Sequence, residues 1–207
     1  VGKHGIVEIE ESKSFETSIR TTEGTSFQRG YMSPYFVTNE ETSKAILNDS
    51  FVLLCSDRLN SIKEILPILQ KVSAKGQPIL IIAEDFDNQV IEFLVLNKFQ
   101  GTLKICAVKA PSFGYEKSQL MEDLAVITGG KIIGAETGGA TVDKMKLEDL
   151  GQAKIITVDK SSTKIVDGLG TKEDVQTRIK QIENMASEST SEYEKEKLAE
   201  RIAKLSG

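Results

Sequence analysis

The run Phe51-Val52-Leu53-Leu54-Cys55 decides the fold, together with a second run of the same character, Ile79-Leu80-Ile81-Ile82-Ala83. Both runs are apolar at every position and are bounded by polar residues, which is typical of strands buried on both faces of a sheet. Between them, Asn60–Ala74 carries apolar residues at helical spacing and is followed by Gly76, a residue that commonly ends helices. A strand, a helix and a strand in this order predict two parallel strands joined by a right-handed crossover.

The alternation of strands and helices continues along the chain. Helices are predicted at Asp87–Phe99 and Gln119–Thr128, and strands at Leu103–Val108 and Lys131–Ile133. A hairpin is predicted for Lys154–Val158 and Thr163–Val166, and a half-exposed strand for Ile6–Glu10. Together these elements predict an α/β fold in which flanking helices cover a largely parallel central sheet.

Two capped helices are predicted near the C-terminus. Thr171 with Asp174, and Ser191 with Glu194, form capping boxes, in which side chains satisfy free backbone amides at the start of a helix. Each helix carries one apolar stripe, formed by Val175, Ile179, Ile182 and Met185 in the first helix and by Leu198, Ile202 and Leu205 in the second. Charged residues cover the other faces, so we expect a C-terminal helical hairpin that packs against the domain.

The composition is that of a globular protein with a substantial core. Of 207 residues, 39% are hydrophobic and 28% are charged, and the formal net charge is −5. This acidic balance argues against general nucleic-acid binding, and no apolar run is long enough to insert into a membrane as a spanning helix. No charged and apolar leader opens the chain, so we expect a location in the bacterial cytoplasm or in an organelle matrix. Because the chain begins with Val1 rather than Met, we also expect it to be part of a longer protein.

Residues suited to catalysis or metal binding are scarce. His4 is the sole histidine, and Cys55 and Cys106 lie in apolar runs, where we expect reduced core thiols. The sequence therefore predicts no Ser-His-Asp site, no zinc site and no phosphate-binding glycine loop. We expect this chain to hold no catalytic residue, no metal and no cofactor of its own.

One acidic pair leaves an enzymatic alternative open. Glu84 and Asp85 follow the apolar run that ends at Ala83, at the edge where open α/β sheets usually bind ligands. Carboxylate oxygens are good ligands for Mg²⁺, so this pair is compatible with a Mg²⁺-dependent nucleotide-binding enzyme. Alternatively, both residues cap the next helix, where negative charge near the N-terminus is favourable.

Three segments carry more apolar residues than a core requires. Along Val90–Phe99, apolar side chains spread almost all the way round the helix. Leu66 and Leu69 turn away from the main stripe of the preceding helix, which comprises Ile65, Ile68 and Val72. Gly30–Phe36 gathers three aromatic residues and a Met around Pro34, which favours a turn with projecting side chains. Each segment is either buried in the core or forms an exposed surface for a partner.

Five stretches of the chain match the pattern of one family: Arg29–Phe36, Leu80–Asp85, Ala107–Gly114, Leu147–Lys154 and Glu196–Arg201. In order and nearly without gaps, they resemble the group I chaperonins of the GroEL type, and the similarity extends from Val1 to Gly207. The resemblance implies the apical-domain fold for residues 23–207, entered through a short intermediate-domain segment at residues 1–22. It also implies that the parent protein is a homo-oligomeric double ring and an ATP-dependent foldase, with its ATP and Mg²⁺ sites outside this chain.

In that family, the apical domain binds non-native polypeptides and the co-chaperonin (GroES type) in a single apolar groove. Matched position by position, the resemblance places this groove at Tyr31, Tyr35, Phe36, Leu66, Leu69, Ile91, Val95 and Leu96. All eight residues belong to the three segments with surplus apolar residues. This agreement leads us to expect that the surplus forms a binding groove, whose apolar character suits clients of many different sequences.

The chain departs from the family pattern at several positions. Ser112 stands where a glycine is usual, Met32 stands where a leucine is usual, and Tyr115–Ser118 replaces a basic stretch. The loop around Gly138 and Gly139 is one residue longer. These departures are typical of a divergent paralogue in which the groove residues are kept.

Overall fold

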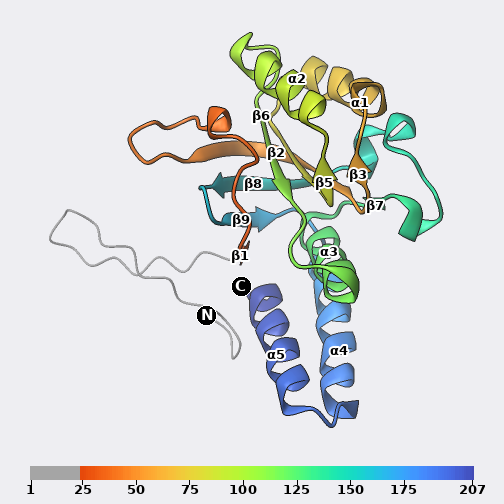
Figure 1. The fold of residues 1–207 in the computed structure, drawn as a ribbon. Coiled ribbons are helices and arrows are strands. Elements are labelled where there is room, and N and C mark those ends of the chain that lie inside the picture. The colour runs from red at the N-terminus through yellow and green to blue at the C-terminus, as the bar shows by residue number, and fades with distance from the viewer. Residues whose placement is uncertain (1–23) are drawn as a thin grey trace, which may run out of the picture.

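The chain folds around one mixed sheet, within residues 24–207 that the computed structural model describes. The strand order is β1-β9-β8-β2-β4-β6, and β7 pairs with β2 (Figure 1). The strands of this sheet are β1 (Gly24–Phe27), β2 (Ala45–Cys55), β4 (Ile79–Ala83), β6 (Ile105–Lys109), β7 (Ile132–Ile133), β8 (Gly151–Val158) and β9 (Thr163–Gly168). A separate parallel pair is formed by β3 (Arg58–Leu59) and β5 (Asp85–Phe86). The α/β class is confirmed. The sheet is mixed rather than largely parallel, because β1, β9, β8 and β2 pair antiparallel while β2, β4 and β6 pair parallel.

Strand β2 is where the sheet changes from antiparallel to parallel pairing. It begins at Ala45, well before the apolar run Phe51–Cys55, and pairs antiparallel with β8 on one side and parallel with β4 on the other. The predicted hairpin is confirmed as β8 and β9, both longer than expected. His4, the predicted strand Ile6–Glu10 and the expected intermediate-domain segment (residues 1–22) lie outside the described residues.

Five helices accompany the sheet in this part of the chain: α1 (Ile62–Lys75), α2 (Asn88–Phe99), α3 (Gly114–Thr128), α4 (Lys172–Glu188) and α5 (Glu192–Ser206). Gly76 ends α1 as predicted, with a left-handed φ of 68°. Helix α3 begins at Gly114 rather than at the predicted Gln119. Its N-cap residue, Phe113, makes no side-chain capping bond, so the sequence carries no capping signal at this end of the helix. Among the described residues, no helix is both long and apolar enough to cross a bilayer.

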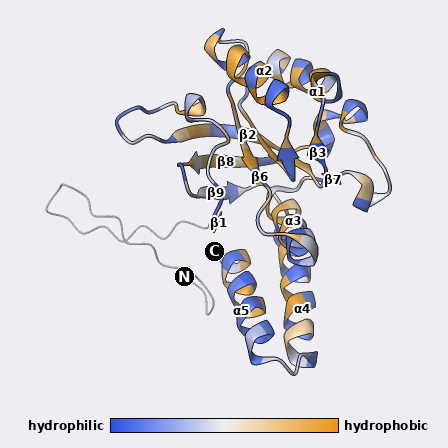
Figure 2. Cartoon of the chain, viewed as in Figure 1, coloured by the Kyte–Doolittle hydropathy of each residue, from blue (hydrophilic) through white to orange (hydrophobic). Residues whose placement is uncertain are grey.

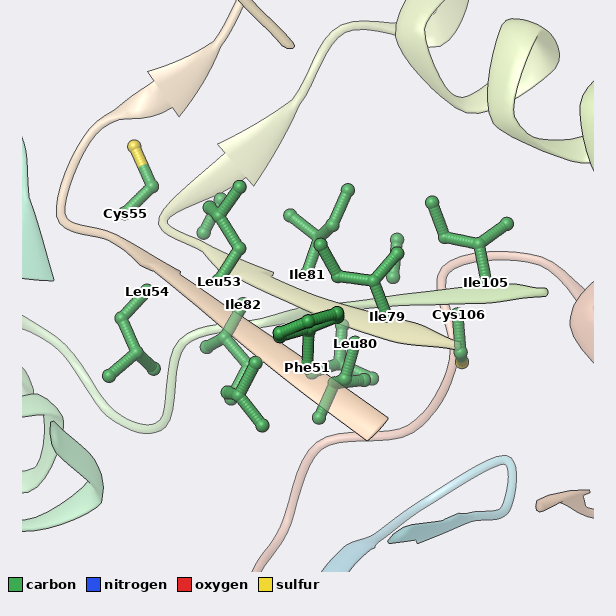
Figure 3. Close-up of a cluster of buried hydrophobic side chains, with 14 of the residues drawn as sticks. Phe51, Leu53, Leu54, Cys55, Ile79, Leu80, Ile81, Ile82, Ile105 and Cys106 are labelled. Carbon is green, nitrogen blue, oxygen red and sulfur yellow. The ribbon is translucent and has the colours of Figure 1, made fainter. Parts of the chain in front are cut away.

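The apolar strands β2, β4 and β6 form the centre of the core (Figure 3). Phe51 pairs with Ile79 and Ile79 with Ile105, so their side chains meet in register across three strands. Helices α1 and α2 lie together over one side of these strands, at the top of Figure 1, and α3 packs against β2 and β8. Cys55 and Cys106 are free and buried, as predicted, and burial raises the pKa of the Cys55 thiol to about 11.

The predicted C-terminal helical hairpin is present as α4 and α5. Thr171 and Ser191 accept hydrogen bonds from the amides of Asp174 and Glu194, so both predicted caps are formed. The two stripes meet in a small core of their own, which is formed by Ile179, Ile182, Leu198, Ile202 and Leu205. Figure 2 shows the hydrophilic residues that cover the remaining faces of this hairpin.

A buried ion cluster joins the hairpin to α3. Arg178 of α4 donates through Nε to Asp123 Oδ1 at 2.8 Å. Arg201 of α5 donates to both carboxylate oxygens of Asp123, at 2.7 and 3.0 Å. All three side chains are nearly inaccessible to solvent. One carboxylate of α3 therefore holds both helices of the hairpin.

We predict that Asp123→Asn lowers the free energy of unfolding by about 3–5 kcal/mol, because it removes the carboxylate that pairs with buried Arg201 and one of the two carboxylates that pair with Arg178. Glu192→Gln is the matched control, since exposed Glu192 pairs with Lys195 at 3.2 Å within one helix. Loss of the Glu192–Lys195 ion pair should lower the free energy of unfolding by at most about 0.5 kcal/mol. Urea unfolding of both variants measures the difference, and a wild-type midpoint for Asp123→Asn would contradict the role given to this cluster.

Candidate functional site

The segment that follows β1 lies along the free edge of β6. The amide of Met32 donates to Ala107 O at 2.8 Å, and Tyr31 forms an isolated antiparallel bridge with Val108. The chain then enters a 3-10 turn, η1 (Pro34–Phe36). Ser33 caps this turn by accepting from the amide of Tyr35 at 3.2 Å. The predicted turn around Pro34 is thus confirmed, and it sits at the edge of the sheet beside α2.

Lys98 of α2 ties this turn to the helix. Its Nζ donates to Tyr35 O at 2.7 Å and to Val37 O at 2.9 Å. Next to it, the rings of Tyr35 and Phe99 meet edge to face, with centroids 5.7 Å apart and an interplanar angle of 63°. Because α1 leads into β4 and α2 leads into β6, α2 lies between α1 on one side and η1 on the other.

The predicted site residues differ widely in exposure. Tyr35 is 62% exposed and Leu96 is 55% exposed, while Tyr31, Ile91 and Val95 are partly buried against the core. Leu66 is also accessible. Two predicted site residues, Phe36 and Leu69, are inaccessible to solvent and lie within the core. The expected orientation of these two side chains was therefore wrong.

Helix geometry explains the position of Leu69. Ile65 and Leu69 are four residues apart and Leu69 and Val72 are three apart, so all three share one face of α1. That face packs on the sheet, and Leu66 lies about 100° away from it. Phe36 is buried for a related reason, since the tight turn η1 sends Tyr35 outward and the next side chain inward.

The accessible apolar residues of α2 form one row along one flank, and Leu96 lies on the other flank. Val90 and Leu94 face the core. Ile91, Val95 and Phe99, each four residues apart, follow the flank that carries Lys98 and therefore face η1. Leu96 lies on the opposite flank. On α1, Leu66 shares its flank with Ser73, whose hydroxyl donates to Thr102 O just beyond the end of α2.

These side chains, which are exposed or partly exposed, lie on the segment from Tyr31 through η1, on α2 and on α1, and together they form an apolar surface. We define the apolar surface as Tyr31, Tyr35, Leu66, Ile91, Val95, Leu96 and Phe99. Phe99 is 64% exposed and was not among the predicted site residues. Its signal was present in the sequence, because it belongs to the segment whose apolar residues run all round the helix. Lys98 carried no such signal, since nothing in the sequence places its ammonium beside the carbonyls of η1.

The acidic pair after β4 is engaged in ion pairs. Glu84 accepts from Lys117 Nζ at 3.0 Å, and Lys117 itself is buried. Asp85 pairs with Arg58 at 3.2 Å and with Lys109 at 3.3 Å. The amide of Phe86 donates to Asp85, and this bond, together with the two cations, lowers the pKa of that carboxyl below its ordinary value.

Neither acid caps the next helix. The N-cap of α2 is Asp87, whose carboxylate accepts from the amide of Gln89 at 3.0 Å. The interpretation of Glu84 and Asp85 as capping residues was therefore wrong. Within residues 24–207, no three acidic, histidine or cysteine side chains gather as a metal site would require.

We predict different costs for two leucines of α1. Leu69→Ala should lower the free energy of unfolding by about 2–5 kcal/mol, because it leaves a cavity where the side chain is 2% exposed. Leu66→Ala should cost less than about 1 kcal/mol, because Leu66 is 37% exposed and water can fill the space. Urea unfolding monitored by circular dichroism compares the two, and equal losses would contradict the assigned orientation of α1.

A scan against models of known protein families finds none that matches this chain.

Proposed function

We propose that this chain is the apical domain of a group I chaperonin and that its apolar surface binds non-native polypeptide. The observation that carries the proposal is the exposure of Tyr35, Leu66, Leu96 and Phe99 on three neighbouring elements. Soluble proteins rarely leave large apolar side chains gathered on one surface unless a partner covers them. Six of the eight residues that the resemblance supplies are exposed or partly exposed, while Phe36 and Leu69 are buried. Phe99 is an exposed neighbour that the resemblance does not supply.

The surface suits clients that differ in sequence. Apolar contact is not directional, so it rewards any segment that brings apolar side chains to the surface. The surface is also preformed, because buried stripes hold α1 and α2 on the sheet and Lys98 holds η1 on α2. A client therefore loses its own conformational freedom on binding while the domain loses little.

The proposal includes the partners that the family resemblance implies. The co-chaperonin binds the same surface through an extended loop, and the parent protein is a homo-oligomeric double ring in the bacterial cytoplasm or an organelle matrix. ATP and Mg²⁺ act in parts of the parent outside this chain. The alternative of a Mg²⁺-dependent enzyme is not favoured, because both Glu84 and Asp85 already have cationic partners.

We predict that Leu96→Glu weakens binding of a permanently unfolded, carboxymethylated protein by about tenfold or more. A charged carboxylate pressed against an apolar client costs several kcal/mol. Leu169→Glu is the matched control, because Leu169 is 53% exposed against 55% for Leu96 and lies in the loop between β9 and α4. Fluorescence anisotropy of the labelled client measures both affinities, and circular dichroism verifies both folds. Equal affinities for the two variants would contradict the proposal.

We also predict that a co-chaperonin loop peptide and the unfolded client compete. Both ligands need the same apolar residues, so adding client should displace labelled peptide at client concentrations near its own dissociation constant. Val95→Glu should weaken both ligands in parallel. The single domain should bind the peptide only weakly, because a ring gains affinity by engaging several loops at once. Simultaneous binding of both ligands would show that they use different surfaces.

A further inference from the structure

We propose that Tyr35 and Phe99 form an aromatic subsite that selects aromatic side chains in non-native polypeptides, and that Lys98 positions it. This inference rests on the proposed function of the apolar surface and adds a preference to it. It concerns Phe99 and Lys98, two residues outside the set that the family resemblance supplies. Apolar character alone rewards the area that is buried and not the geometry of a ring, so a preference that depends on ring geometry does not follow from it.

The arrangement of the two rings supports the subsite. They meet edge to face at 5.7 Å, yet Tyr35 remains 62% exposed and Phe99 64% exposed. A third ring placed against this pair can adopt the offset or edge-to-face geometry that aromatic groups prefer. An aliphatic side chain at the same place gains only the burial of its area. The exposed ring pair therefore favours an aromatic side chain over an aliphatic one.

The position of the subsite on the apolar surface separates it from the aliphatic contacts. Along α2, Ile91 and Val95 are aliphatic and partly buried, and Phe99 follows one helical turn later at the end of the helix. Leu66 and Leu96 add aliphatic area on the other flank of α2. The rest of the surface thus supplies general apolar affinity, and the ring pair at one end supplies the preference.

Lys98 acts as a positioning residue, because it holds the backbone that carries one ring beside the helix that carries the other. Its bonds to Tyr35 O and Val37 O, at 2.7 and 2.9 Å, join η1 to the last turn of α2. Its Nζ also lies 5.2 Å from the centroid of the Phe99 ring, within the range of a cation–π contact. The same ammonium group therefore contacts the backbone of Tyr35 and the ring of Phe99.

Two labelled peptides test the preference on the full chain. Both alternate serine and leucine, and they differ at one central position, which is phenylalanine in the first and leucine in the second. Wild type should bind the phenylalanine peptide about two- to tenfold more tightly, as measured by fluorescence anisotropy. Phe99→Leu keeps an apolar side chain and should bring the ratio of the two affinities close to one.

Three further variants separate positioning from simple apolar contact. Lys98→Met keeps the apolar stem but removes the donor, so it should lose most of the preference, and Lys98→Arg, which retains donors, should restore part of it. Leu66→Ala should weaken both peptides in parallel and leave their ratio unchanged. Thermal melting verifies the fold of each variant, and Phe99→Leu serves as the decisive variant if Lys98→Met fails to fold.

The outcomes distinguish this inference from the proposed function. If wild type binds both peptides equally, or if Phe99→Leu keeps the preference, the aromatic subsite is wrong while the polypeptide-binding surface stands. If wild type binds neither peptide, both are overturned. A preference that disappears in Phe99→Leu and Lys98→Met, but survives in Leu66→Ala, supports the subsite.

Discussion

The burial of both faces of β2, β4 and β6 is the constraint on which the rest of the structure depends. The segments Phe51–Cys55 of β2, Ile79–Ala83 of β4 and Ile105–Val108 of β6 are apolar without alternation, so neither face tolerates water there and both must be covered. Parallel strands also need crossovers that return over the sheet, and these crossovers are α1 and α2. The two helices therefore lie next to each other on one side, each with a buried stripe and an outer flank that the sheet does not use.

The edge of the sheet adds the third element of the apolar surface. Strand β6 is the last strand on its side, and an uncovered edge strand invites pairing with other chains. Here the segment from Tyr31 to Met32 bonds to that edge, which carries η1 to the flank of α2. The same contacts that close the edge thus bring Tyr35 to Phe99. The backbone contacts of Tyr31 and Met32 with β6 therefore both cover the edge of the sheet and bring the exposed apolar side chains together.

The accessible residues show how little separates core from surface on a short helix. Leu66 and Leu69 are both leucines of α1, less than one turn apart, yet Leu69 belongs to the buried stripe and Leu66 does not. On α2, apolar residues occur all round, so only the direction of the sheet decides that Val90 and Leu94 are buried. Polar contacts add to this packing. Lys98 bonds η1 to α2, and cationic side chains pair with Glu84 and Asp85, whose carboxylates are of the kind that bind metals.

The sequence by itself determined the α/β class, the buried strands, most of the helices and the C-terminal hairpin. These features follow from local rules of apolar periodicity and capping, which act within a few residues of one another. It also indicated which segments carry surplus apolar residues. It did not determine the mixed pairing of β2, the inward orientation of Phe36 and Leu69, or the tie from Lys98 to η1. Those depend on which surfaces meet after folding, because a side chain is buried or exposed only relative to elements that lie far away in the chain. Tertiary packing alone therefore decided which of the surplus residues face solvent together.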